Sequence, residues 1–222
     1  MVGLPPARVL VLDLDGTLVD TVPDLAAALN RLMTGRRLAG FTFPETAAMV
    51  GDGVARLVEK AFAARGTTPD QAAIADFSAD YAASAAVDSR LYPNVLTTLG
   101  GLLSEGWRLA VCTNKPEGAA RSLLTALGLT PLITAVGGGD SFPVRKPDPA
   151  HLLATLRAAD GVPERALMLG DHANDVTAAR GAGMRCVFAA WGYGPPAMAE
   201  GAAAIAGDMI EAAAIARRML PD

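Results

Sequence analysis

The sequence contains only two cysteines, Cys112 and Cys186, among its 222 residues. Their spacing matches neither a zinc site nor a redox motif. Both stand in apolar runs typical of strands, where reduced cysteines behave as small hydrophobic residues. We therefore expect two reduced thiols in a core and no zinc site.

Clusters of basic residues are absent too. The 19 basic residues are outnumbered by 23 acidic ones, and they gather only in short pairs such as Arg36-Arg37 and Arg217-Arg218. Nucleic-acid-binding proteins carry a basic patch or stripe, which this chain lacks. We therefore expect small solutes as partners rather than nucleic acid.

Long apolar runs and a leader-like start are missing as well. No apolar stretch approaches the length needed to cross a membrane, and the first strand begins too early to leave room for a signal peptide. These features predict a cytoplasmic protein with no membrane partner. The sequence leaves the choice between monomer and homodimer open.

Hydrophobic residues, by contrast, make up 51% of the chain, enough for a sizeable core. The first apolar run, residues 9–12, is typical of a buried strand of a parallel sheet, yet Asp13, Asp15 and Gly16 follow it at once. Alternation along a strand turns both carboxylates toward one side, and Gly16 allows a ligand to approach the backbone. A shared cation, an acid–base pair or both would explain the two charges, whereas a lone Asp-x-Asp-Gly is more typical of a surface turn.

The rest of the chain changes pattern at Tyr92-Pro93. Between residues 21 and 87, apolar spacing predicts four helices, at 23–33, 44–50, 54–65 and 69–87, and no strand. Strands then alternate with helices; the strands are expected at 108–112, 132–136, 166–169, 185–189 and 203–206. This order predicts an α/β fold, a doubly wound parallel sheet formed by residues 1–20 and 88–222, with a helical cap at 21–87.

Polar groups follow several of the predicted strands. Thr113 and Asn114 follow the second, Lys146 lies in the loop after the third, and Asp171 follows the fourth. Because right-handed crossovers place these strand ends at one edge of the sheet, the groups should meet Asp13 there. Each residue alone would be an ordinary loop residue; together they predict a site.

These residues occur in four motifs. They are DLDGTLVD at 13–20, CTNK at 112–115, RKPDP at 145–149 and GDHAND at 170–175. In this order they strongly resemble the haloacid dehalogenase-like phosphohydrolase superfamily, and most closely its phosphoglycolate phosphatase group. The resemblance covers essentially the whole chain, including the helical insert, which is similar to the mobile cap of that superfamily.

The resemblance implies a division of labour between the first carboxylates. Asp13 would attack phosphorus and form an aspartyl phosphate, while Asp15 would act as general acid and then as general base. Mg²⁺ would be the cofactor, held by the carboxylates of Asp13 and Asp171 and the backbone carbonyl of Asp15.

The resemblance also assigns the residues around the phosphate. The Thr113 hydroxyl and backbone amides near Gly16 and Asn114 would bind phosphoryl oxygens. Lys146 would balance the negative charges, and Asp175 would orient Lys146 or a metal-bound water.

The two histidines are less clear. His172 replaces the small hydroxyl residue common at this place in relatives, so it is expected either beside the metal site or simply at the surface. His151 lies on a predicted helix and is expected to be structural.

The cap should select the substrate. The glycine-flanked turn Gly51-Asp52-Gly53, with Arg56 nearby, resembles a substrate-specificity loop, and Lys115 is another candidate for contact with a substrate carboxylate. The first choice of substrate is 2-phosphoglycolate. A sugar phosphate or another small phosphomonoester is the alternative.

Other functions share parts of this pattern. A β-phosphoglucomutase-like transferase has both aspartates and the cap, and a receiver-type signalling domain also combines Asp, Thr, Lys and magnesium. Dehalogenase and phosphonate hydrolase chemistry are disfavoured because Asp15 supplies an acid that those enzymes lack. The acid at Asp15 and the helical insert also argue against the receiver domain.

Overall fold

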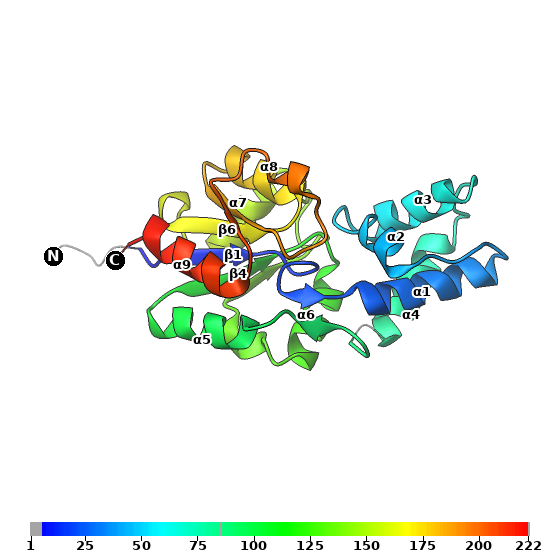
Figure 1. Ribbon diagram of the computed structural model, residues 1–222, viewed down its shortest axis with the longest axis horizontal. Coiled ribbons are helices and arrows are strands. Elements are labelled where there is room, and N and C mark those ends of the chain that lie inside the picture. The colour runs from blue at the N-terminus through cyan, green and yellow to red at the C-terminus, as the bar shows by residue number, and fades with distance from the viewer. Residues whose placement is uncertain (1–5, 85, 222) are drawn as a thin grey trace.

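The computed structural model describes residues 6–84 and 86–221, and Figure 1 shows a sheet with its helices beside a separate group of helices, α1 to α4. Six parallel strands form the sheet in the order β5-β4-β1-β6-β7-β8. The strands are β1 (Val9–Leu12), β4 (Arg108–Cys112), β5 (Ala135–Gly137), β6 (Ala166–Gly170), β7 (Arg185–Ala189) and β8 (Ala204–Ala206). The prediction of a doubly wound α/β fold is confirmed.

Strand β1 lies inside the sheet between β4 and β6, and all four of its residues are buried. Its side chains alternate: Leu10 and Leu12 join one core cluster, while Val9 and Val11 join the other. Burial on both faces explains why this strand is an unbroken apolar run. The carboxyl end of β1 therefore opens at the middle of one sheet edge.

Helices cover both faces of the sheet, as Figure 1 shows for α5 and α6 on one side and α7 and α8 on the other. Residues of α5, α6 and α9 pack in the first cluster, and those of α7 and α8 in the second. The helices are α5 (Val95–Ser104), α6 (Glu117–Ala126), α7 (Pro149–Ala158), α8 (Ala173–Gly181) and α9 (Met209–Met219).

Cys112 and Cys186 are free and buried, and burial raises the pKa of the Cys112 thiol to about 12, so it is unreactive.

The four helices before residue 88 have a core of their own. They are α1 (Val22–Gly35), α2 (Phe43–Ala47), α3 (Val54–Ala64) and α4 (Ala73–Ser84). Leu29, Phe62 and Phe77 are among the residues buried between them. The term "cap" below means residues 21–87, and the domain boundaries at 20 and 88 stay a prediction.

Two short strands, which the sequence pattern did not predict, join the cap to the sheet. Strand β2 (Val19–Asp20) pairs with β3 (Arg90–Leu91) in antiparallel fashion. Beside this ribbon the buried carboxylate of Asp24 accepts hydrogen bonds from the Asp88 and Ser89 amides and the Ser89 hydroxyl. The two linkers are thus bonded to each other and to the start of the cap.

Three predicted elements differ from the structure. The helix expected at 44–50 is the shorter α2, which ends at Ala47. The helix expected at 69–87 begins only at Ala73, because a turn in which Asp70 accepts the amides of residues 72 and 73 precedes it. Its last described residue is Ser84. The strand expected at 132–136 is confined to 135–137, because residues 130–132 form a 3-10 turn that Pro131 favours. Similar turns lie at 163–165 and 196–199.

Residues 1–5, 85 and 222, which fall within the predicted ranges, lie outside the described residues. In the part of the chain that is described, no helix has the length and apolar character needed to span a membrane.

Candidate active site

The site is built around Lys146, whose side chain is completely buried. Its Nζ lies 2.9 Å from Asp13 Oδ1 and 2.6 Å from Asp175 Oδ1. Burial favours the neutral amine, but the charges of Asp13 and Asp175 outweigh it and raise the pKa of Lys146 above its ordinary value. His151 is also buried, and its Nδ1 accepts a hydrogen bond from the Lys146 amide, so this histidine is structural as expected.

Asp171 stands at the end of β6 and is 2% exposed. Its Oδ1 accepts a hydrogen bond from the Thr17 hydroxyl, and its Oδ2 accepts one from the Tyr193 amide, both at 2.8 Å. Burial, and secondly the charge of Asp13, raise the pKa of Asp171 to about 7. A carboxylate in this position gains from a neighbouring cation.

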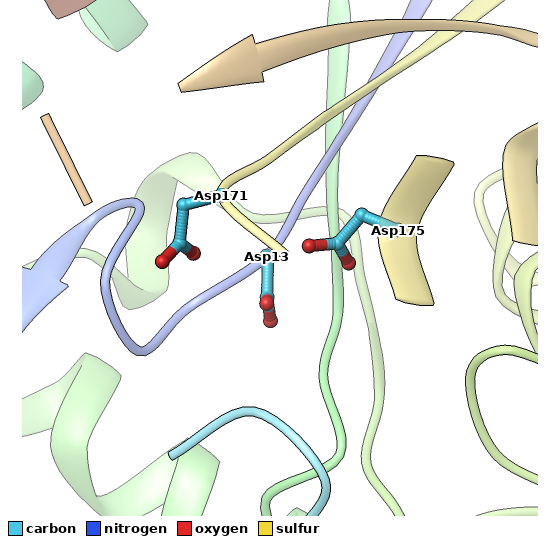
Figure 2. Close-up of side chains that lie close together, drawn as sticks. All are labelled: Asp13, Asp171 and Asp175. Carbon is cyan, nitrogen blue, oxygen red and sulfur yellow. The ribbon is translucent and has the colours of Figure 1, made fainter. Parts of the chain in front are cut away.

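Figure 2 shows the side chains of Asp13, Asp171 and Asp175 close together; the first two follow β1 and β6, and Asp175 lies in the first turn of α8. One ligand oxygen from each lies within 4.8 Å of the others, and all three residues are buried. Buried carboxylates repel one another unless positive charge is shared among them, and Mg²⁺ prefers such oxygen ligands. The residues therefore fit a hard divalent cation. Asp175 was expected only to orient Lys146 or a water, but it lies within the same cluster.

Gly16 is required by the close packing around Asp171. Its φ is +83°, and a Cβ added there would lie 2.8 Å from the Tyr193 ring and would collide with the Asp171 carboxylate. The turn after β1 therefore has room for glycine only. The same turn leaves the Gly16 amide bonded to the Val19 carbonyl at 2.9 Å, so a phosphate contact there stays a prediction.

Asp15 is bonded to Lys115 and to Thr21 at the start of the cap. Both of its carboxylate oxygens accept hydrogen bonds from Lys115 Nζ, at 2.9 and 3.1 Å, and Oδ1 also accepts one from the Thr21 hydroxyl. The Lys115 ammonium lies 4.5 Å from the centre of the Tyr81 ring. Burial opposes its charge, but Asp15 and Tyr81 outweigh burial and raise the pKa of Lys115. Sequence reasoning named Lys115 as a candidate for the substrate and did not foresee this ion pair.

Thr113 and Asn114 are buried at the end of β4. Thr113 Oγ1 accepts a hydrogen bond from the Lys115 amide at 3.2 Å. The Asn114 side chain donates to the Lys146 carbonyl at 2.9 Å and to the carbonyl of Gly51, in the cap, at 3.0 Å. Thus the predicted phosphate site and the cap are directly connected.

The Gly51 carbonyl also accepts a hydrogen bond from the Asn174 side chain, at 2.8 Å. The His172 ring packs so closely on Gly51 that an added Cβ would lie 2.6 Å from its Cδ2. Burial lowers the pKa of His172, which favours the neutral ring. His172 is therefore half-buried at the boundary between the cap and the sheet, next to Asp171. Asn174 belongs to the GDHAND motif but was not singled out.

A cavity of about 260 Å³ lies between the cap and the carboxyl edge of the sheet. One end is formed by Asp13, Asp15, Thr113, Asn114 and Lys115. Most of the remaining lining is apolar and comes largely from the cap; it includes Leu25, Val50, Val54, Leu57, Ala82 and Ala119. Ser78 and Tyr81 add two hydroxyl groups from α4.

The predicted specificity loop contributes only in part. Gly51 and Gly53 line the cavity, whereas Asp52 is paired with Lys60 at 2.7 Å and Arg56 with Glu59, both outside it. The Arg56 side chain is 56% exposed. The residues that reach the cavity instead are Tyr81 and Ser78, which no motif marked. A substrate role for Asp52 or Arg56 stays a prediction without a contact in this structure.

The chain resembles known proteins along most of its length. The family model for haloacid dehalogenase-like hydrolases matches residues 7–183. The chain belongs to this family. A phosphoglycolate phosphatase of Rhodospirillum rubrum is 42% identical over 210 residues, 90% of this chain and 87% of that protein. One of Agrobacterium fabrum is 40% identical over 204 residues, 90% of this chain and 88% of that protein.

A solved structure agrees with these sequence matches. The crystal structure of a predicted phosphoglycolate phosphatase from Haemophilus somnus superimposes with a TM-score of 0.87 at 31% identity, covering 96% of this chain and 99% of that one. These findings confirm the expected resemblance and an enzyme of the phosphoric monoester hydrolase type. A signalling domain of the receiver type is thereby set aside.

Proposed function

We propose that the protein is a Mg²⁺-dependent phosphatase that hydrolyses 2-phosphoglycolate to glycolate and phosphate. One observation carries the proposal: a single small cavity holds the Asp13 carboxylate at one end and the Lys115 ammonium beside it. Such a cavity suits a small molecule that carries a phosphate, which would lie at Asp13, and a second anionic group, which would lie at Lys115. The names of the relatives from Rhodospirillum and Agrobacterium support the same substrate.

In this proposal Asp13 attacks phosphorus, forming a P–O bond to the carboxylate while the bond to the glycolate oxygen breaks. Asp15 gives the departing alkoxide a proton and then takes one from the water that cleaves the aspartyl phosphate. General acid–base help of this kind is worth roughly 10²- to 10⁴-fold in rate. Lys146, bonded to Asp13 at 2.9 Å, reduces the repulsion between the nucleophile and the phosphate.

The carboxylates of Asp13 and Asp171 and the carbonyl of Asp15 would hold Mg²⁺, with Asp175 at the edge of the same cluster. When bound, the cation would offset negative charge on the phosphoryl oxygens. Thr113, which is buried and lines the cavity, would donate its hydroxyl proton to one of those oxygens.

The carboxylate of the substrate would be bound by Lys115 and Tyr81. Lys115 is the one basic side chain among the described residues that line the cavity. The Tyr81 hydroxyl, buried on the same cavity wall, makes no hydrogen bond of good geometry within the described part of the chain. Burial raises its pKa, so the hydroxyl keeps its proton and remains a donor. A buried donor without an acceptor gains when a carboxylate arrives.

The cavity walls argue against a sugar phosphate. Sugars need several polar partners for their hydroxyl groups, and a buried hydroxyl left without one is costly. Apart from Ser78 and Tyr81, the described residues that the cap helices α1 and α4 contribute to the lining are apolar. A mutase-like transfer between sugar hydroxyls is disfavoured for the same reason.

A comparison of two substrates tests the proposal. Ethyl phosphate has the same two-carbon leaving group as 2-phosphoglycolate but no carboxylate. In the presence of Mg²⁺, we expect kcat/KM to be roughly 10²-fold higher for 2-phosphoglycolate than for ethyl phosphate. This factor is typical of one desolvated contact between charged groups. Equal values for the two substrates would contradict the carboxylate site, and no phosphate release from either would contradict the phosphatase.

Two variants assign the result to residues. Asp13→Asn should remove turnover of both substrates, because an amide cannot attack phosphorus. Tyr81→Phe should lower kcat/KM for 2-phosphoglycolate about fivefold, the value of one hydrogen bond, and leave ethyl phosphate nearly unchanged. Phosphate release with an acceptor sugar present, compared with its absence, separates hydrolysis from transfer.

A further inference from the structure

The loop after β7 contacts both the cap linker and the proposed metal site. Trp191 Nε1 donates a hydrogen bond to the Thr17 carbonyl at 3.0 Å. Two residues later, the Tyr193 amide donates to Asp171 Oδ2 at 2.8 Å. The mechanism above uses neither aromatic residue, although both belong to one short segment of the sequence.

The Tyr193 hydroxyl uses its full bonding capacity on the first cap linker. It accepts hydrogen bonds from the amides of Thr21 at 2.7 Å and Val22 at 3.2 Å, and it donates to Asp20 Oδ1 at 2.8 Å. A phenol has one proton and two lone pairs, so no further partner is needed. Burial raises the pKa of Tyr193, which keeps this proton in place.

These two amides belong to the start of helix α1. The amides in the first turn of a helix have no partner within the helix and are usually bonded by the side chain of the N-cap residue. Here the N-cap residue, Thr21, makes no such bond, and its hydroxyl donates to Asp15 instead. The phenol of Tyr193, from the other side of the junction, instead bonds the amide of Thr21 itself and that of Val22, the first helical residue.

The same loop is fitted tightly against Asp171. A Cβ added at Gly192 would collide with the Asp171 side chain, and one at Gly194 would collide with its backbone carbonyl. The Tyr193 ring itself packs against the cap core and against Gly16. A displacement of the phenol is therefore transmitted to the backbone that orients the carboxylate.

We propose that Tyr193 is a positioning residue that couples the cap hinge to Asp171. Its hydroxyl holds the linker from which α1 begins, and its amide holds the carboxylate. A swing of the cap about residues 20–22 then changes the orientation of Asp171 through one residue. The inference concerns this chain's own contacts and does not depend on which phosphomonoester is the substrate.

Two variants test the coupling from its opposite ends. Tyr193→Phe removes only the hydroxyl. We expect the rate of amide hydrogen exchange in the 20–25 segment to rise about tenfold. At Asp171, we expect the affinity for Mg²⁺, measured by calorimetry without substrate, to fall about fivefold, the effect of losing one hydrogen bond. Gly194→Ala pushes on Asp171 and does not remove the phenol. Because coupling is reciprocal, it should also speed exchange of the 20–25 segment.

Tyr81→Phe is the matched control: it removes another buried phenol that has no bond to the linker, and it should change neither measurement. The proposal is overturned if each variant alters only its own end, or if Tyr193→Phe alters neither. Thermal melting shows whether each variant is folded. Should Tyr193→Phe not fold, the exchange result for Gly194→Ala decides alone.

Discussion

Lys115 Nζ lies within hydrogen-bond distance of both carboxylate oxygens of Asp15, at 2.9 and 3.1 Å. The proposed general acid and the proposed carboxylate-binding residue are therefore partners before substrate arrives. Both side chains are largely buried, at 14% and 3% exposure. Binding of a substrate carboxylate has to compete with this ion pair.

Replacement of Lys115 separates its two roles. Lys115→Met keeps most of the side-chain volume and removes the charge. We expect kcat/KM for 2-phosphoglycolate to fall about 10²-fold or more and that for ethyl phosphate by less than about tenfold. Equal losses on both substrates in steady-state kinetics would show that Lys115 serves Asp15 alone. Lys115→Arg, which retains a charge, is the control.

Asn174 holds the cap near the site through the Gly51 carbonyl. Asn174→Ala leaves that carbonyl with the Asn114 donor only, so the closed position loses one hydrogen bond. KM should rise about fivefold, with a smaller change in kcat, and amide exchange at residues 51–53 should be faster. Thr177→Ala, an exposed change on the same helix, is the matched control. An unchanged KM would mean that this contact does not contribute to closure.

Asp24 stabilises the second linker by accepting three hydrogen bonds from Asp88 and Ser89. Asp24→Ala leaves the buried Ser89 amide and the part-buried Asp88 amide without these acceptors, which should lower the free energy of unfolding by about 2–5 kcal/mol. Urea denaturation measures the loss. Asp24→Asn retains one acceptor oxygen and should fall between the alanine variant and the parent. A loss below about 1 kcal/mol for alanine would argue that water replaces the carboxylate.

Asp171 makes the stability of the metal-free protein depend on pH. Its pKa is about 7 in the folded protein against an ordinary 3.8, so between these values the folded state binds more protons. The contribution of the Asp171 carboxyl to the free energy of unfolding is therefore fully present below about pH 4 and is lost as the pH rises through about 7. The loss is at most about 4 kcal/mol. Thermal melts at about pH 5 and pH 8 with a chelator measure it.

Asp171→Asn should weaken this pH dependence, because an amide does not titrate. Added Mg²⁺ should stabilise the parent more at the higher pH, since protons and cations compete for one carboxylate. The explanation fails if the asparagine variant keeps the full pH dependence.

The sequence was sufficient to place the carboxylates. Parallel strands end at one sheet edge, so Asp13, Thr113 and Asp171 meet there whatever the details of the loops. The apolar runs of β1 and β4 are buried on both faces and were therefore identifiable without periodicity. Lys146, in the loop after β5, was expected at the same edge, and its motif supported that placement.

The contacts between cap and sheet could not be predicted in this way. Strands β2 and β3 have two residues each, too few for any pattern. The orientation of the turn at residues 51–53 depends on side chains of Asn114 and Asn174, which are distant in sequence. For this reason Arg56 was expected at the cavity and Tyr81 was not.

The β2–β3 ribbon has a mechanical consequence. Two separate linkers would leave the orientation of the cap free. Here Val19 pairs with Leu91 and Asp20 with Arg90, so the two linkers form one ribbon. A narrow ribbon bends more easily than its strands slide past each other, because sliding breaks the hydrogen bonds between the strands while bending preserves them. A cap that moved on this ribbon would therefore swing about one axis, and closure would return the Gly51 carbonyl to the Asn114 and Asn174 side chains.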